Sequence, residues 1–307
     1  MDISHSNSKT AIFGDVGGHW KPFVNGLTSI GVDVKHRVIP AGLTVVQLGD
    51  LIHKGPSSNE LVILADEMMQ QNNSDSSRGR WVQLMGNHES QYFLGAPRFW
   101  AMQCSGQSIA TLNRWWQNKD MLLHHVVEQD NGKPFVVSHA GISHRLFFHA
   151  ESIWNAIGTN NSPDYGANLQ ERTLAGFSEW LESLQPERMD IVAQPGAMLT
   201  GKISRNAGLV WAESIREVYS TWRSEENIPF HQVHGHSAPF TWSRSKFYPS
   251  VPEIYRKEIV LDKRARHSFW ANTDDTLFIG VDPGFDRSAD RDIITPLVID
   301  SSGIVNE

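Results

Sequence analysis

The sequence predicts a layered α/β fold, and three features of the chain indicate it. Short apolar runs typical of buried strands recur at residues 11–13, 43–48, 81–85, 135–137, 230–233, 276–281 and 296–299. Most of these runs end at a small or polar residue, as buried strands commonly do. A segment with helical spacing lies between two of the runs. Strands that alternate with helices are typical of layered α/β folds.

The elements between the strands follow from local patterns. A helix is predicted over residues 58–71, because apolar side chains recur at helical spacing in Leu61, Leu64, Ala65, Met68 and Met69. The polar stretch 71–79 then predicts a surface loop. Residues 121–138 are predicted to form a hairpin, since Asp130-Asn131-Gly132 is a favoured turn sequence.

The whole chain of 307 residues, 1–307, is expected to form one domain. Its 40% of hydrophobic and 20% of charged residues are ordinary for a globular protein and sufficient for a large core. We find no internal repeat and no composition change that would mark a domain boundary. Two irregular stretches, residues 145–208 and 240–275, are predicted to be lid or insert regions beside the sheet.

Charge and cysteine content limit the classes of partner. A net charge of −7 argues against a nucleic-acid-binding surface, although bound cations can still attract a phosphate substrate. The single cysteine, Cys104, excludes an intrachain disulfide and a thiolate metal cluster, and favours a reducing compartment. The first ten residues lack an apolar core, and no stretch approaches the ~20 apolar residues of a membrane span. We therefore expect a soluble, cytoplasmic protein without a membrane partner.

Polar residues that can bind metal follow five of the apolar runs. These residues are Asp15, Asp50, Asn87 with His88, His139 and His236. In layered α/β folds, sites gather where strands end. Carboxylates, an amide oxygen and imidazoles without sulfur suit Mn, Fe, Zn or Mg. Two such cations ~3.5–4 Å apart can clamp a phosphoryl group and generate a nucleophile from water.

The same residues carry a resemblance to a known family. The motifs resemble those of calcineurin-like metallophosphoesterases, nearest the branch of Ser/Thr protein phosphatases and symmetrical diadenosine tetraphosphatases. They are Gly49-Asp50-x-x-x-Lys54-Gly55-Pro56, Gly86-Asn87-His88-Glu89, His139-Ala140-Gly141 and Gly235-His236-Ser237. The resemblance implies a four-layer sandwich, in which two mixed β-sheets are flanked by helices.

The resemblance also implies a ligand set for two divalent or trivalent metal ions. Asp50 would bridge the two ions and Asp15 would bind the first. The second ion would be held by Asn87, His139 and His236. A hydroxide between the ions would then attack phosphorus in line.

Catalytic and substrate-binding roles follow from the same motifs. His88 would act as general acid and protonate the departing oxygen. Lys54 occupies the position of an arginine that holds phosphate, and supplies its charge without the bidentate fork. Asn87 would contact the substrate as well as the metal. Arg205 and Arg216 lie near a Leu-Trp segment at 209–211 that is similar to one in this branch, and are candidates for a phosphate grip.

Two further departures from the family pattern concern the active site. The first motif of the family is Gly-Asp-x-His, but residue 17 is glycine. His19 is therefore a candidate replacement ligand, reached through the flexible Gly17-Gly18 pair. His53, which we count among the catalytic candidates, stands where the family has an aspartate that orients the general acid.

The expected function is hydrolysis of a phosphate ester or anhydride. The substrate class stays open among a phosphoprotein, a nucleotide such as a dinucleoside polyphosphate, and a small phosphorylated molecule. One alternative is a non-catalytic phosphate- or protein-binding module on a decayed phosphoesterase fold. A distant alternative is a serine hydrolase that uses Ser237 with Asp262 and His267.

Overall fold

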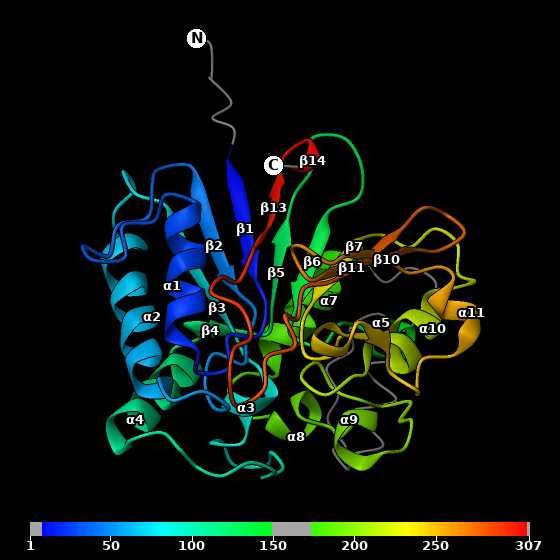
Figure 1. Ribbon diagram of the computed structural model, residues 1–307, viewed down its shortest axis with the longest axis horizontal. Coiled ribbons are helices and arrows are strands. Elements are labelled where there is room, and N and C mark those ends of the chain that lie inside the picture. Colours follow the sequence, from blue (N-terminus) through cyan, green and yellow to red (C-terminus); the bar gives the residue numbers. More distant parts are fainter. Residues whose placement is uncertain (1–7, 149–172, 306–307) are drawn as a thin grey trace.

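The computed structural model describes residues 8–148 and 173–305 and contains two six-stranded sheets (Figure 1). The strand order of the first sheet is β14-β13-β1-β2-β3-β4. Neighbours from β1 to β4 are parallel, and β13 and β14 are antiparallel, so the sheet is mixed. Its strands are β1 (Lys9–Phe13), β2 (Leu43–Gln47), β3 (Arg80–Leu84), β4 (Met121–Leu122), β13 (Leu297–Asp300) and β14 (Gly303–Ile304).

The second sheet is also mixed and has the order β10-β11-β12-β7-β6-β5. Strand β7 is parallel to both β6 and β12, and the other pairs are antiparallel. Its strands are β5 (His124–Val127), β6 (Phe135–Ser138), β7 (His231–His234), β10 (Val260–Asp262), β11 (His267–Ala271) and β12 (Leu277–Gly280). A separate small ribbon pairs β8 (Phe240–Thr241) with β9 (Lys246–Phe247).

All the predicted strands are present. The predicted hairpin is confirmed as the antiparallel pair β5–β6. Its first two residues, Met121–Leu122, instead pair with β3 in the first sheet. Residues 240–275, which the sequence left unassigned to elements, contribute β8 to β11.

The two sheets pack face to face through a buried apolar layer. Alternate side chains of the first sheet point into it, from Ile12, Val46, Leu48, Val82 and Leu84. Val137, Val233 and Ile279 meet them from the second sheet. Because successive strand residues point to opposite faces, the neighbouring residues face the helices instead. This packing brings the carboxyl ends of β1, β2, β3, β6 and β7 to one edge.

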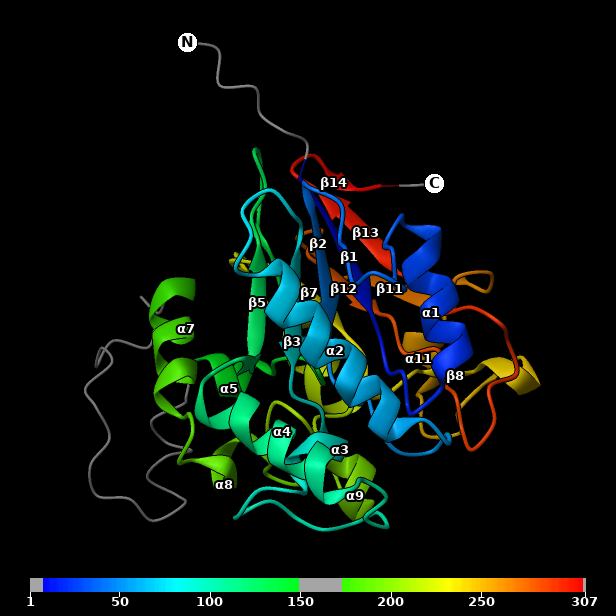
Figure 2. The same cartoon turned by 90° about the vertical axis from the view of Figure 1, so that its left-hand side faces the viewer.

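Helices cover the outer face of the first sheet, on the left in Figure 1. Helix α1 (Trp20–Ser29) and the predicted helix, confirmed as α2 (Ser58–Asn72), bury apolar side chains against it. Helix α4 (Gly106–Gln117) lies beside α2 (Figure 2), where the Trp115 indole N–H donates to Asp66 at 2.8 Å. No helix in residues 8–148 or 173–305 is long and apolar enough to cross a membrane.

Short helices cover the outer face of the second sheet. They include α5 (His144–Phe148), α7 (Leu174–Ser183), the π-helix η1 (Ser214–Tyr219) and α10 (Ser220–Trp222). Rings of Phe147, Phe177, Trp222 and Phe230 pack together beneath them. The remaining short helices are α3 (Asn87–Ser90), α8 (Met189–Val192), α9 (Ala197–Thr200), η2 (Trp242–Arg244) and α11 (Glu253–Arg256).

The architecture is therefore helix, sheet, sheet, helix, which is the predicted four-layer sandwich. Residues 149–172 of the predicted lid 145–208 lie outside the described residues. The lid roles of 145–208 and 240–275 stay predictions.

Candidate metal centre

Two loops that leave the first sheet are joined by backbone hydrogen bonds. The N–H groups of Val16 and Gly17 donate to the Asp50 carbonyl at 3.0 and 2.7 Å. Gly55 N–H donates back to the Gly17 carbonyl at 2.8 Å. These bonds place the loop after β1 against the loop after β2, so Asp15 and Asp50 lie side by side.

Unusual backbone conformations concentrate at this edge. Four non-glycine residues have positive φ here: Asp50 (52°), His53 (71°), Lys54 (58°) and His236 (60°). Such conformations cost free energy and cluster at functional sites, where the surrounding structure holds them in place. Gly86 is required for a different reason, because a Cβ there would collide with the Asp50 backbone and carboxylate. The motif glycines therefore permit the close approach of the polar groups.

Four predicted ligands of the second ion converge in a buried cluster. Single donor atoms of Asp50, His139 and His236 all lie within 4.8 Å of one another. Asn87 Oδ1 lies 3.1 Å from both His139 Nε2 and His236 Nδ1. His139 Nε2 is 3.4 Å from Asp50 Oδ1. All four side chains are buried.

The chemistry of these donors fits a cation. The His139 Nδ1–H donates to the Leu48 carbonyl at 3.0 Å, so Nε2 is left with a lone pair that points at Asn87 and Asp50. This arrangement, in which the second ring nitrogen is fixed by a carbonyl, is usual for metal-binding histidines. When the oxygen and nitrogen of the Asn87 amide exchange places, the two N–H groups face four acceptor atoms, which belong to Asp50, His139 and His236. The site is therefore rich in acceptors. A cation at their centre would satisfy all of these lone pairs at once.

Asp15 lies on the other side of Asp50. Its Oδ1 accepts the His236 backbone N–H at 2.9 Å, while its buried Oδ2 has no hydrogen-bond partner among the described residues. Burial, and then the negative charges of Asp282 and Asp50, raise the pKa of Asp15 well above its usual range. An unpartnered carboxylate oxygen in this position fits the first of the two predicted cations, with Asp50 shared between them. Burial also acts to raise the pKa of Asp50, but the facing imidazoles of His88 and His139 outweigh it and lower that pKa.

His19 lies close to the predicted position of the first ion, but its ring is engaged elsewhere. Its Nε2–H donates to the Asp286 carbonyl at 2.7 Å, and its ring packs against Phe285 with centroids 5.3 Å apart. A Cβ added at Gly17 would lie 3.3 Å from Lys54 Cδ. The Lys54 stem therefore occupies the space that a side chain at position 17 would need. The role of His19 as a ligand stays a prediction.

His88 lies beside the cluster, with its Nε2 3.7 Å from Asp50 Oδ2. Its Nδ1 is 2.7 Å from Nδ1 of the fully buried His53. Burial lowers the pKa of His88 to about 3 and that of His53 to about 4, although the charge of Asp50 opposes both shifts. The predicted orienting position is thus occupied by a neutral imidazole in contact with His88.

Aromatic side chains surround His88 and His236. The rings of Phe99 and Trp100 lie 4.9 and 5.3 Å from the His88 ring, centroid to centroid. Trp211 packs edge-on against both Phe99 (4.6 Å) and His236 (5.6 Å). The sequence pointed to Trp211 through the Leu-Trp segment, whereas no local signal identified Phe99 or Trp100.

Glu89 has a structural role that the sequence pattern did not predict. It is fully buried, and its carboxylate accepts N–H groups of Asp50 (2.8 Å), Leu51 (2.9 Å), Ile52 (3.3 Å) and Gly86 (3.0 Å). It thereby fixes the loop that carries Asp50. The residue stands in the Gly-Asn-His-Glu motif, which was the available signal.

Basic side chains line two separate cavities. Lys54 lines one of about 450 Å³ together with Asn59, Gln103 and Arg287, the last of which sequence reasoning missed. Burial opposes the charge of Lys54, but Asp15 and Asp50 outweigh it and raise the pKa of the lysine.

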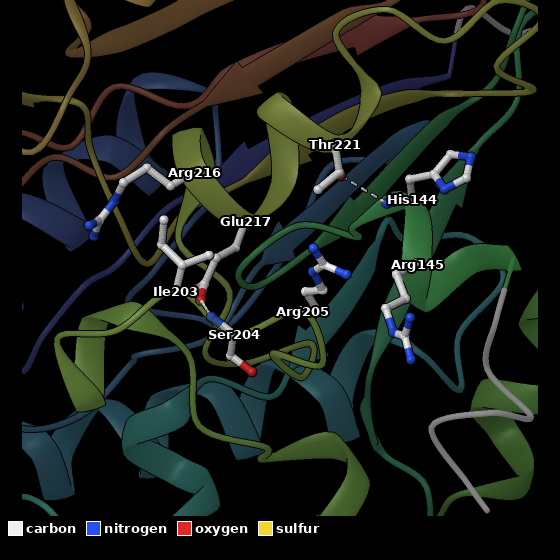
Figure 3. A pocket seen from close by; sticks show the side chains of 8 residues that line it. All are labelled: His144, Arg145, Ile203, Ser204, Arg205, Arg216, Glu217 and Thr221. Carbon is white, nitrogen blue, oxygen red and sulfur yellow. Dashed lines mark hydrogen bonds between the residues drawn. The ribbon is translucent and has the colours of Figure 1, made fainter. Parts of the chain in front are cut away.

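Arg205 and Arg216 line the other cavity, of about 340 Å³, with Arg145 and His144 (Figure 3). In that view the Arg216 guanidinium points away from those of Arg145 and Arg205, and its Nε donates to Glu213 at 3.1 Å. None of the predicted metal ligands lines this cavity. The two arginines are therefore not part of the metal cluster, although Arg216 shares a segment with Trp211.

The arrangement does not assemble the serine-hydrolase triad. Ser237 Oγ accepts the Ser214 N–H at 2.9 Å. His267 donates instead to the Thr295 carbonyl at 3.0 Å, and Asp262 is exposed. Ser237 has no histidine partner among the described residues, so this alternative is wrong.

A family model described as calcineurin-like phosphoesterase matches residues 8–240. The comparison with curated proteins gave no match. Among solved structures, the cold-active protein-tyrosine phosphatase of a Shewanella species is 15% identical, over 97% of this chain and 77% of its own, with a TM-score of 0.46. A protein serine/threonine phosphatase from Saccharomyces cerevisiae is 13% identical, over 96% and 84%, with a TM-score of 0.47. A metallophosphoesterase from Sphaerobacter thermophilus is 18% identical, over 45% and 49%, with a TM-score of 0.27.

Proposed function

This chain belongs to the calcineurin-like phosphoesterase family, and from that premise we propose that it hydrolyses a phosphate ester or anhydride with the help of two bound metal ions. One observation carries the proposal. Donor atoms of Asp50, Asn87, His139 and His236 converge in a buried cluster beside His88. Family membership supports metal-dependent phosphoester hydrolysis in general, and the cluster supplies the ligands that such chemistry needs.

Each ion would be held by residues of this chain. Asp15 with Asp50 would bind the first ion, and Asn87, His139 and His236 with one oxygen of Asp50 would bind the second. Nitrogen and oxygen donors of this kind suit Mn, Fe, Zn or Mg. When bound, the ions would supply positive charge to the phosphoryl oxygens and lower the pKa of water that reacts with phosphorus.

The remaining polar groups would position the substrate and move one proton. Lys54 and Arg287, which line one cavity, would attract the phosphoryl group, and Asn87 would contact it from the cluster. His88 would take up a proton at Nε2 from the attacking water and pass it to the departing oxygen. Phe99 and Trp211 would keep bulk water away from His88 and His236, which strengthens each charge interaction in the site.

The substrate would be a phosphoprotein, a nucleotide such as a dinucleoside polyphosphate, or a small phosphorylated molecule. Arg145, Arg205 and Arg216 would accept a second anionic group of a larger substrate, because all three line one cavity of about 340 Å³. A cytoplasmic location would agree with the single cysteine.

The experiment removes metal with a chelator, restores single metals, and counts bound ions by elemental analysis. Hydrolysis of p-nitrophenyl phosphate, its bis-ester and diadenosine tetraphosphate is assayed in parallel. We expect activity to return with a metal and to fall at least about a hundredfold in Asp50→Asn, because the shared ligand is lost. Asp292→Asn, on the exposed surface, is the matched control and should retain wild-type activity. Chelator-resistant turnover would contradict the proposal.

A second candidate function is a phosphate- or protein-binding module without turnover. Gly17 and His53 favour it, because both replace residues that the family motif uses. In the same experiment this candidate predicts binding of inorganic phosphate, with no hydrolysis of any of the three substrates at any metal concentration.

A further inference from the structure

The amide of Gln91 is fixed in one orientation by the backbone. Gln91 is buried, and its Oε1 accepts the N–H groups of Phe99 at 3.4 Å and Trp100 at 3.1 Å. Only the oxygen of a carboxamide can accept a hydrogen bond. Its Nε2 must therefore be the donor in the 3.1 Å contact with His53 Nδ1.

This contact fixes the protons of His53. Because Gln91 donates to it, Nδ1 of His53 carries a lone pair, and the ring proton of the neutral imidazole is on Nε2. That nitrogen donates to the Tyr92 hydroxyl oxygen at 2.8 Å. The same oxygen accepts the Cys104 backbone N–H at 3.3 Å. Tyr92 thus receives two hydrogen bonds, which leaves its own hydroxyl hydrogen for the Cys104 thiol.

The state of His53 then determines that of His88. The two Nδ1 atoms are 2.7 Å apart, and one hydrogen must lie between them. Since His53 Nδ1 is the acceptor, His88 Nδ1 is the donor. We propose that His53, Gln91 and Tyr92 are positioning residues that hold His88 in its Nδ1–H form, with the Nε2 lone pair directed at the metal cluster. The role of His88 in the reaction rests on the function proposed above, whereas its tautomer does not.

A neutral imidazole needs this support, and a carboxylate would not. A carboxylate only accepts, so it orients a neighbouring histidine whatever surrounds it. An imidazole can either donate or accept, and it orients His88 correctly only while its own proton is held on the far nitrogen. Gln91 and Tyr92 meet that requirement from opposite sides of the His53 ring. The replacement of aspartate at position 53 is therefore compensated by residues 91 and 92, which directly follow α3, the helix that carries His88.

The direct test is the tautomer of each histidine in the full-length protein labelled with 15N-histidine. Long-range 1H–15N correlation spectra distinguish the two neutral forms, and are recorded with chelator and again with Zn²⁺. The signals are assigned with His53→Asn and His88→Asn. We expect His53 as the Nε2–H form and His88 as the Nδ1–H form in both conditions. The opposite form of either ring would overturn the proposal, and neither reading depends on catalytic activity.

Kinetics of single variants provide the second test. Gln91→Glu puts a carboxylate oxygen against His53 Nδ1 and should draw the proton to that nitrogen, which reverses both tautomers. We expect kcat for p-nitrophenyl phosphate to fall about tenfold or more, with KM within about twofold. Tyr92→Phe should act in the same direction, because His53 Nε2–H loses its acceptor. Unchanged kcat and unchanged histidine signals in both variants would contradict the proposal.

Matched controls separate positioning from general destabilisation. Tyr219→Phe removes a buried hydroxyl bonded to Glu258, and Gln185→Glu alters a buried amide bonded to Met121. Both should keep wild-type kcat. His53→Asn retains an oxygen near the Nδ1 position and should keep more activity than His53→Leu. Equal kcat in these two variants would overturn a positioning role. A wild-type protein without turnover, but with the expected tautomers, would refute the proposed function alone.

Discussion

Among single residues, Lys54 has the most unusual surroundings. It is partly buried, its stem lies over Gly17, and the charges of Asp15, Asp50 and Asp282 act on its ammonium group. The same carboxylates Asp15 and Asp50 are the donors expected to hold the first ion. A fixed positive charge there competes with a cation, whereas the ion at His139 and His236 has a larger donor set. The two ions should therefore bind with unequal affinity.

Substitution of Lys54 tests this competition. We expect Lys54→Met to tighten the weaker of two Mn²⁺ sites about tenfold, because one neighbouring positive charge is removed. The same variant should have a lower kcat/KM, since the substrate phosphate loses a cation. Mn²⁺ titration followed by electron paramagnetic resonance measures both sites.

Lys133→Met is the matched control for this substitution, because Lys133 is also partly buried and lies 2.9 Å from a carboxylate, that of Asp274. It should leave both Mn²⁺ affinities unchanged. Equal affinity of the two sites in the wild-type protein would contradict the argument, as would weaker binding in Lys54→Met.

Residue identity alone pointed to side chains that the fold brings into one buried cluster, because each of them follows a strand within three residues. It predicted less about the groups that hold those ligands. The His53, Gln91 and Tyr92 network depends on contacts across 38 or 39 positions, which no local pattern records. His19 shows the converse problem. Its position suggested a ligand, but the carbonyl that engages it belongs to Asp286, 267 residues away.

At the level of elements, the loop after β2 is held by the short helix α3. Glu89 of α3 accepts four N–H groups, three of them from residues 50–52. This loop carries Asp50 with φ at 52°, a conformation that the surroundings must maintain. The helix therefore positions Asp50, the proposed shared ligand, and also supplies Asn87 and His88.

We expect Glu89→Gln to lower both stability and metal affinity. The NH2 group of the new glutamine is a donor and would face backbone N–H donors, so at least one of these would lose its acceptor. This loss should lower the free energy of unfolding by about 2–3 kcal/mol. The loop would then relax and metal affinity should fall about tenfold. Chemical denaturation measures the first effect and metal titration the second.

The chain offers a close control in Glu217. This buried carboxylate likewise accepts backbone N–H groups, from Ala197 at 3.0 Å and Glu213 at 2.8 Å. Glu217→Gln should lose a similar amount of stability and keep its metal affinity. If Glu89→Gln and Glu217→Gln lose metal affinity equally, Glu89 affects metal binding only through the stability of the fold.

Elements were predictable where a periodic apolar pattern is strong, as in α2 and the strands of the two sheets. Helix α4 was not assigned, because its stability comes from packing on α2. Strands β10 and β11 also escaped assignment. Strand β10 has only three residues and is an edge strand with Val260 and Asp262 exposed, so it carries no periodic apolar pattern.

At the level of the whole molecule, the second sheet buries His267 apart from the proposed metal ligands. His267 in β11 is 3% exposed and its Nε2–H donates to the Thr295 carbonyl at 3.0 Å. Burial lowers its pKa to about 4 from 6.5, although the hydrogen bond opposes the shift. Between these two values the unfolded chain binds more protons at this position than the folded chain. The folded state therefore loses stability as the pH falls from about 6.5 towards 4.

Replacement of His267 by glutamine should reduce this acid sensitivity. The glutamine amide would keep an N–H donor near the position of Nε2, so His267→Gln and wild type should have similar stability at pH 7. At pH 4.5 the variant should be more stable than wild type by on the order of 2 kcal/mol, because it has no imidazole to protonate on unfolding. Urea denaturation at both pH values, in the presence of chelator, measures the difference. If both proteins lose the same stability between pH 7 and 4.5, protonation of other groups destabilises the fold. In that case His267 is not held neutral by the core.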